Sequence, residues 1–207
     1  MTANEGEPMD GCDGRVTRGG VVRMAAGAGA ALAGGAALAS RGGSVSEAAP
    51  SAAQDARLLN VFLLLERLQQ RFYAGALERG RLRGQLLAFA GATERQEAAH
   101  VRRLTERLAG DVDPAPDADF TAVTSSSERF GDAAIALEEA TLAAYIAHGA
   151  ALTREAVAAI VPIVSVEARQ AAWIRDLAGV DPAPRAADPP RDAQDVLDGL
   201  RADGLLR

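Results

Sequence analysis

The sequence predicts an all-α protein whose main domain is an antiparallel four-helix bundle. Residues 55–178 keep a helical spacing of apolar residues, and no segment alternates polar and apolar residues as a β-strand would. Four long segments in this range are rich in Ala, Leu, Glu, Arg and Gln, which favour helices. Short connections join the first two segments and the last two, whereas a long connection containing Pro114 and Pro116 joins the pairs. This connectivity predicts a long crossover between the second and third helices.

The predicted helices cover residues 55–79, 82–108, 128–150 and 153–178. Each is close to the ~25 residues, or roughly 37 Å, of a bundle helix. Ser127 is the expected N-cap of the third helix, because a serine oxygen can accept a hydrogen bond from the first helical turn. Residues 179–207 are rich in proline and finish with an amphipathic segment, which predicts a C-terminal extension with one short helix.

The first 39 residues have the layout of an export signal. A polar, arginine-containing start precedes an apolar run over residues 24–39, and Ala37 and Ala39 supply a small-x-small cleavage site. The long polar start is similar to a twin-arginine export signal, although Gly19 stands where the second arginine belongs. We therefore expect export to the periplasm or cell envelope, with a disordered cytoplasmic tail as the alternative. Residues 40–54 are small and polar, as a linker should be.

The charge pattern argues against a nucleic-acid partner. The chain carries 28 acidic and 22 basic residues, a net charge of −6, and acids and bases alternate along the predicted helices. The single cysteine, Cys12, precedes the predicted domain, which excludes a cysteine-based metal cluster. The apolar run before Ser40 is too short and too rich in glycine for a comfortable membrane span, and we expect none in the mature domain.

Four glutamates, Glu66, Glu97, Glu138 and Glu167, fall on the apolar faces of the predicted helices. Glutamates of helices are usually solvated, and a lone buried carboxylate is costly unless it is paired, protonated or bound to metal. The four therefore predict a shared polar site in the core. His100 follows Glu97 on the same face at the i, i+3 spacing, so that a carboxylate and an imidazole can bind one ion.

The second half of the predicted bundle repeats the first half. A tyrosine follows the core glutamate by seven residues in the first and third helices, as Tyr73 and Tyr145. In the fourth helix Gln170 takes the position that His100 has in the second. Each hairpin thus brings two glutamates and a third polar group to the middle of the bundle. The tyrosines either donate to these groups, act as redox-active residues beside a metal, or pack as amphipathic core residues.

A resemblance to ferritin-like domain proteins, especially exported and desiccation-related bacterial ones, is carried by four segments: QDARLLNVFLLLERLQQRFYAGAL, RQEAAHVRRL, ALEEATLAAY and SVEARQAAWIRDL. The resemblance implies a di-iron site with one Glu from each of two helices and a Glu-x-x-His pair from each of the others. It assigns the metal ligands to Glu66, Glu97, His100, Glu138, Glu167 and Gln170. Gln170 departs from the pattern, because an amide oxygen binds a divalent transition metal less well than an imidazole nitrogen does.

Two functions are expected from these observations. The first is an exported protein with a degenerate di-iron-type carboxylate site that binds or oxidises iron, at one or two ions, with another divalent metal as the alternative cofactor. The second is a metal-free structural or stress-related envelope protein that uses the bundle as a scaffold. The sequence contains no nucleotide-binding motif and no nucleophile triad, so neither expectation names a catalytic residue.

Overall fold

The computed structural model describes residues 49–115 and 117–206. The predicted export segment and residues 40–48 of the predicted linker lie outside the described residues. Every secondary-structure element in the described residues is a helix, so the fold class is all-α. They are α2 (Ala52–Glu78), α3 (Gly84–Leu108), α4 (Ser127–His148), the 3₁₀-helix η2 (Gly149–Ala151), α5 (Arg154–Leu177) and α6 (Ala193–Ala202).

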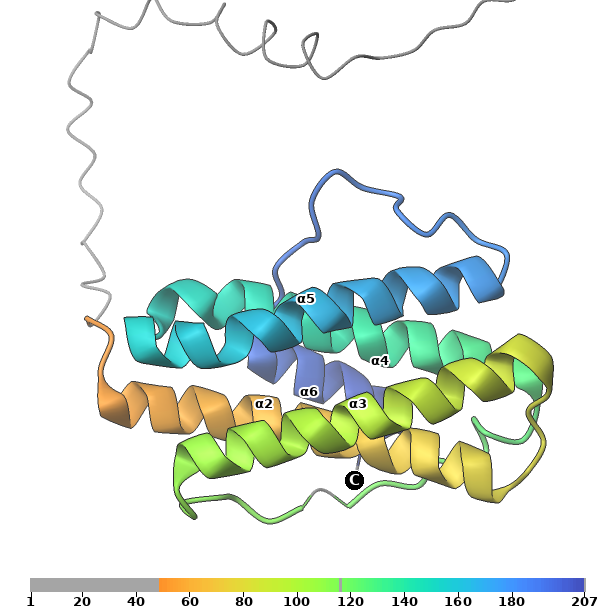
Figure 1. Cartoon of the computed structure of the whole chain (residues 1–207), viewed down its shortest axis with the longest axis horizontal. Helices are drawn as coiled ribbons and strands as arrows, with labels where there is room; N and C mark the ends of the chain where they lie inside the picture. The colour runs from red at the N-terminus through yellow and green to blue at the C-terminus, as the bar shows by residue number, and fades with distance from the viewer. Residues whose placement is uncertain (1–48, 116, 207) are drawn as a thin grey trace, which may run out of the picture. The chain divides into compact units, whose positions relative to one another are not determined.

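The four long helices pack against one another along their lengths (Figure 1). The chain reverses direction between α2 and α3 and again between α4 and α5, and the described part of the connection between α3 and α4, residues 109–115 and 117–126, lies beside α2. α2 contacts α3 and α4, and α5 contacts the same two helices. The middle of this arrangement is therefore lined by all four helices.

The described residues contain a fifth α-helix, α6, which packs on α4. It buries Val196 and Leu200 in the same apolar core as the long helices. His148, at the end of α4, holds the start of α6, because its Nε2 accepts a hydrogen bond from the backbone N–H of Ala193 at 3.0 Å. The C-terminal extension thus contributes to the core that surrounds the site.

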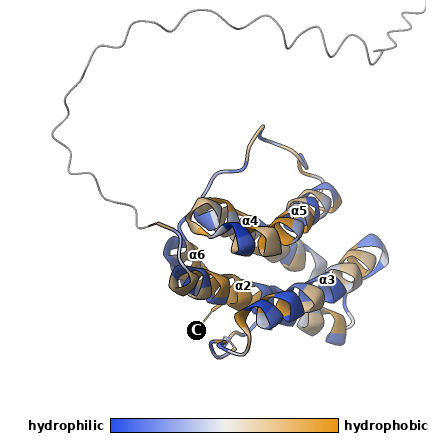
Figure 2. Cartoon of the chain, turned by 60° about the vertical axis from the view of Figure 1, so that its left-hand side comes forward, coloured by the Kyte–Doolittle hydropathy of each residue, from blue (hydrophilic) through white to orange (hydrophobic). Residues whose placement is uncertain are grey.

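Apolar side chains from all five α-helices meet in one core. Aromatic rings form much of it, with Phe72 stacked on Phe130 at a centroid distance of 5.2 Å. Hydrophobic and hydrophilic residues both occur along each long helix (Figure 2), as expected for helices that are buried on one side only. Several polar residues nevertheless lie on the buried side, and these form the site described below.

Hydroxyl side chains cap three of the helices. Ser51, Ser126 and Thr153 each accept a hydrogen bond from the backbone N–H three residues further on, at the starts of α2, α4 and α5. The prediction that Ser127 caps the third helix was wrong by one residue. Ser126 has the extended backbone of an N-cap, with φ −143° and ψ 162°, whereas Ser127 is already helical. Consecutive serines offer the same side chain, so only the backbone distinguishes them.

Asp55 joins the starts of α2 and α5. Its carboxylate is buried and accepts two hydrogen bonds from Thr153, one from the backbone N–H at 2.9 Å and one from the hydroxyl at 2.6 Å. The Thr153 hydroxyl also accepts from the N–H of Ala156. The carboxylate therefore positions the residue that caps α5.

We expect Asp55→Ala to lower the free energy of unfolding by about 1–3 kcal/mol, because it leaves two donors of the partly buried Thr153 without their acceptor. Asp55→Asn keeps one acceptor oxygen and should lose less. Urea denaturation of both variants beside the parent measures the difference. A parent-like midpoint for Asp55→Ala would show that the two bonds contribute nothing to stability.

Among the described helices, α5 is long and apolar enough to cross a membrane, judged by length and composition alone. In the structure this helix packs on α3 and α4. It buries Ile160, Ile163 and Ile174 in the core together with the polar residues Glu167 and Gln170. Apolar side chains of α5 therefore form part of the core of the bundle.

Candidate metal centre

A cluster of polar side chains lies in the core between the four long helices. No member has more than 7% of its surface exposed. Carboxylates in such a dry environment need charged or hydrogen-bonding partners. The members are Glu66, Gln69 and Tyr73 from α2, Glu97 and His100 from α3, Glu138 and Tyr145 from α4, and Glu167 and Gln170 from α5.

Helical spacing explains why these residues are buried together. In α2, Glu66, Gln69 and Tyr73 stand at i, i+3 and i+7, which places them on one face of the helix. The same face carries Leu59 and Phe62, both buried in the core. Because the polar residues of α2 lie on the same face as this apolar stripe, they are buried when the stripe packs into the core. The helices α3 and α5 each add a buried pair of polar residues at i and i+3.

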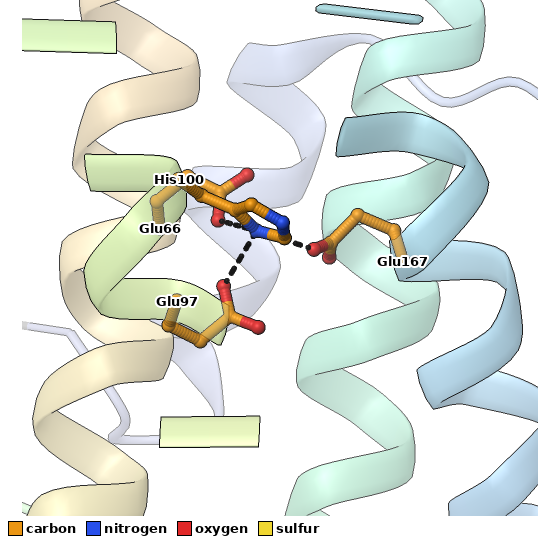
Figure 3. Close-up of side chains that lie close together, drawn as sticks. All are labelled: Glu66, Glu97, His100 and Glu167. Carbon is orange, nitrogen blue, oxygen red and sulfur yellow. Dashed lines mark hydrogen bonds and ion pairs between the residues drawn. The ribbon is translucent and has the colours of Figure 1, made fainter. Parts of the chain in front are cut away.

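The Nδ1 atom of His100 is surrounded by one oxygen from each of three carboxylates (Figure 3). It lies 3.0 Å from Glu66 Oε2, 3.3 Å from Glu97 Oε2 and 3.2 Å from Glu167 Oε1. The first two contacts have hydrogen-bond geometry, whereas Glu167 Oε1 has no hydrogen-bond partner and forms only an ion pair. The four residues offer ligand atoms that all lie within 4.8 Å of one another, so one ion can bind them together.

The second oxygen of each of these three carboxylates accepts a hydrogen bond from a buried side chain. The pairs are the Tyr145 hydroxyl to Glu66 Oε1 at 2.5 Å, Gln170 Nε2 to Glu97 Oε1 at 2.7 Å, and Gln69 Nε2 to Glu167 Oε2 at 3.3 Å. Donors of this kind fix the orientation of a metal-binding carboxylate. Each carboxylate is thereby held with one oxygen turned to the imidazole.

Glu138 differs from the other three glutamates because its partners are Tyr73 and Gln69 and do not include His100. The Tyr73 hydroxyl donates to Oε1, and Gln69 Nε2 donates to Oε2 at 3.0 Å. The tyrosine bonds are crosswise, since Tyr73 of α2 reaches α4 and Tyr145 of α4 reaches Glu66 of α2. Of the alternatives for the tyrosines, the structure shows hydrogen-bond donation to the glutamates.

Removing either tyrosine hydroxyl should destabilise the protein. We expect Tyr73→Phe and Tyr145→Phe each to lower the free energy of unfolding by about 1–3 kcal/mol, because a buried carboxylate loses a donor while the ring still packs. Thermal denaturation of the metal-free variants, followed by circular dichroism, measures the loss. Parent-like melting of both variants would mean that these bonds do not stabilise the fold.

Burial and mutual repulsion raise the pKa of three glutamates in the metal-free cluster. Burial and the charges of Glu167 and Glu66 raise the pKa of Glu97 well above its usual range. Burial and the charge of Glu167 do the same to the pKa of Glu138. Burial and the charge of Glu66 raise the pKa of Glu167 to about 7. Carboxylates that lie close together in a dry core carry less total negative charge at a given pH than they would in water.

His100 and Glu66 form the charged pair of the metal-free cluster. Burial lowers the pKa of His100, but the contacts of its Nδ1 with carboxylate oxygens of Glu167, Glu66 and Glu97 outweigh it and raise the pKa to about 12. Burial raises the pKa of Glu66, but hydrogen bonds with His100 and Glu97 and the imidazolium charge outweigh it, so this pKa falls below its usual range. Near neutral pH the charged pair of the metal-free cluster is therefore the His100 imidazolium and the Glu66 carboxylate.

The structure buries all six residues predicted as metal ligands in this cluster, but it does not place them equivalently. Glu66, Glu97, His100 and Glu167 form the compact group around Nδ1, whereas Glu138 and Gln170 lie at its side and make hydrogen bonds. That these six residues bind metal stays a prediction.

Sequence reasoning missed Gln69, which is fully buried and donates to both Glu138 and Glu167. One pattern could have found it. Gln69 follows Glu66 by three residues, which is also the spacing between Glu167 and Gln170. The i, i+3 pairs of polar residues on apolar faces therefore occur on α2 as well as on α3 and α5.

The residues present fit a divalent metal ion. Glu167 Oε1 is a buried carboxylate oxygen without a hydrogen bond, directed at the imidazole that three carboxylates share. One imidazole and three carboxylates, without thiolate, form a ligand set suited to iron and manganese. To bind an ion, Nδ1 of His100 would give up its proton, since metal competes with protons for these atoms.

Comparison with known proteins identifies the family of the chain. A family model for the ferritin-like domain matches residues 54–180. That range includes every member of the buried cluster and ends just after α5. No curated protein matches the chain. Because the family model covers more than half of the chain, the protein belongs to the ferritin-like domain family.

Proposed function

We propose that this is an exported ferritin-like protein whose buried carboxylate–histidine cluster binds iron. The observation that carries the proposal is the convergence of three carboxylate oxygens, from α2, α3 and α5, on Nδ1 of His100. A proton on one imidazole offsets a single negative charge. A divalent cation offsets two, and it would let all three carboxylates ionise together.

Iron held by these residues would supply one-electron chemistry toward oxygen or peroxide, so Fe(II) oxidation is the reaction that fits this ligand set. The protein's own contribution is to hold the ligands. Tyr145, Gln170 and Gln69 orient the outer carboxylate oxygens through the hydrogen bonds described above. The apolar core around them excludes bulk water, which strengthens every electrostatic interaction in the cluster.

The proposal also covers the fold and the location of the protein. We assign the four long helices to the antiparallel ferritin-like bundle, residues 109–115 and 117–126 to its crossover and α6 to an addition on α4. Residues 1–39 would direct export through a twin-arginine-like signal, and a desiccation-related role would fit a location in the cell envelope. The support for export is the sequence pattern alone.

One observation favours a metal-free structural protein as the second candidate. Most of the carboxylate oxygens in the cluster already have hydrogen-bond partners within it, with the imidazolium of His100 beside Glu66 and amide or hydroxyl donors on the remaining glutamates. Such a network can specify the packing of four helices without a metal. Metal content separates the two functions.

Elemental mass spectrometry after anaerobic loading with Fe(II) and desalting tests the proposal. We expect iron in the full-length parent and in His148→Ala, and none in His100→Ala. His148 is a matched control, because it is the other histidine of the chain and lies outside the cluster. A parent that retains no iron would sink the proposal and favour the structural alternative.

A further inference from the structure

We infer that the cluster is a mononuclear metal site, in which the side-chain amide of Gln69 occupies the place of a second ion. The inference rests on the proposed function and adds the number of ions and the residues that set it. Four side chains, Glu66, Glu97, His100 and Glu167, would bind the single ion.

The first step concerns the atoms that the carboxylate oxygens contact. Each glutamate around His100 has one oxygen on Nδ1 and the other on a hydrogen-bond donor. The set therefore offers one oxygen per carboxylate and one nitrogen, all directed to the same point (Figure 3). Four protein ligands complete a set for one ion and leave room for water or an oxidant at an octahedral metal.

The second step is the position of Gln69. Its Nε2 lies 3.0 Å from Glu138 Oε2 and 3.3 Å from Glu167 Oε2, so it bridges the two carboxylates. An ion that bound the same two oxygens would lie roughly 2.0–2.2 Å from each. The amide nitrogen and the ion cannot both occupy the space between these oxygens. Gln69 therefore does the bridging that a second ion would do.

The third step is that Glu138 has no oxygen without a donor. Tyr73 holds Oε1 and Gln69 holds Oε2. Glu167 differs, because its Oε1 is buried without a hydrogen bond. Among the glutamate oxygens of the cluster, the one without a hydrogen-bond donor thus lies beside His100.

The fourth step is the direction of the Gln170 amide. Its Nε2 donates to Glu97 Oε1 at 2.7 Å and to Gln96 Oε1 at 3.0 Å. The atom of Gln170 that could bind metal is its oxygen, Oε1, which is buried without a hydrogen bond. The amide nitrogen of Gln170 acts as a donor that orients Glu97.

The test counts manganese(II), a stable substitute for Fe(II) in carboxylate sites. Full-length parent, Gln170→His, Gln69→Ala/Gln170→His and the control Gln70→Ala are loaded anaerobically and analysed by elemental mass spectrometry and electron paramagnetic resonance. Gln70 is a matched control, because it is the next glutamine of α2 and is only partly buried. We expect one ion per chain and the spectrum of an isolated ion in all but the double variant, which should bind a second ion.

Each outcome has a distinct meaning. Two ions with a spin-coupled spectrum in the parent would overturn the inference and leave the proposed function intact. Loss of all metal from the parent would overturn both. A second ion in Gln170→His alone, or a folded double variant that still binds one ion, would overturn the role given to Gln69. Circular dichroism shows whether the double variant folds, and the parent's count and spectrum decide the number of ions if it does not.

Discussion

His100→Ala should abolish metal binding and should lower the free energy of unfolding of the metal-free protein by about 3–5 kcal/mol at neutral pH. The imidazole contacts all three inner carboxylates, and its charge is the partner of Glu66. Without it, Glu66 is a buried carboxylate that has lost its charged partner and keeps the Tyr145 hydroxyl as a donor. Guanidinium denaturation in the presence of a chelator measures the loss.

A second substitution distinguishes this loss of charge pairing from a loss of packing. Glu66→Gln in the His100→Ala background removes the unpaired charge and keeps a side chain of similar size. We expect the double variant to regain a large part of the lost stability without regaining metal. A loss below about 1 kcal/mol in His100→Ala, the value of an exposed ion pair, would contradict the charged pair described here.

The metal-free protein should become less stable as the pH rises from 5 to 8. The pKa of Glu167 rises from 4.5 to about 7 on folding, so the stability that it contributes is complete below pH 4.5 and is lost as the pH rises to about 7. The pKa of His100 rises from 6.5 to about 12, so its contribution declines above pH 6.5. Glu97 and Glu138, with raised pKa values, act in the same direction.

Glu66 does not reverse this trend. Its pKa is lowered on folding, so its contribution is already complete above pH 4.5 and stays constant in this window. The shift at Glu167 alone corresponds to on the order of 3 kcal/mol. Metal replaces the protons, so the stabilisation by Mn(II) should grow over the same range. Denaturation midpoints at pH 5 and pH 8, with chelator and with Mn(II), test both statements; a metal-free protein that is more stable at pH 8 would contradict them.

The helices and the burial of the glutamates were predictable because both depend on local patterns. Four long periodic segments predicted the long helices, and glutamates inside apolar stripes, such as Glu66, are buried as expected. The helix ends were less certain, as the cap of α4 shows, because adjacent serines are equivalent until the backbone is known.

The pairing of side chains across the bundle was not predictable from the sequence. The bonds from Tyr73 to Glu138 and from Gln69 to Glu167 depend on how far each helix slides and rotates against its neighbours. Gln170 was predicted as a metal ligand, and only the structure shows its amide nitrogen on Glu97. Periodicity identifies the face of a helix on which a residue lies, but it does not identify the atom that meets it.

The most direct test is anomalous diffraction from crystals of the Mn(II)-loaded protein. We predict one strong peak in the core, roughly 2.0–2.3 Å from His100 Nδ1 and from the inner oxygens of Glu66, Glu97 and Glu167. A core without anomalous density, in crystals that carry manganese elsewhere or not at all, would contradict the assignment of this cluster as a metal centre.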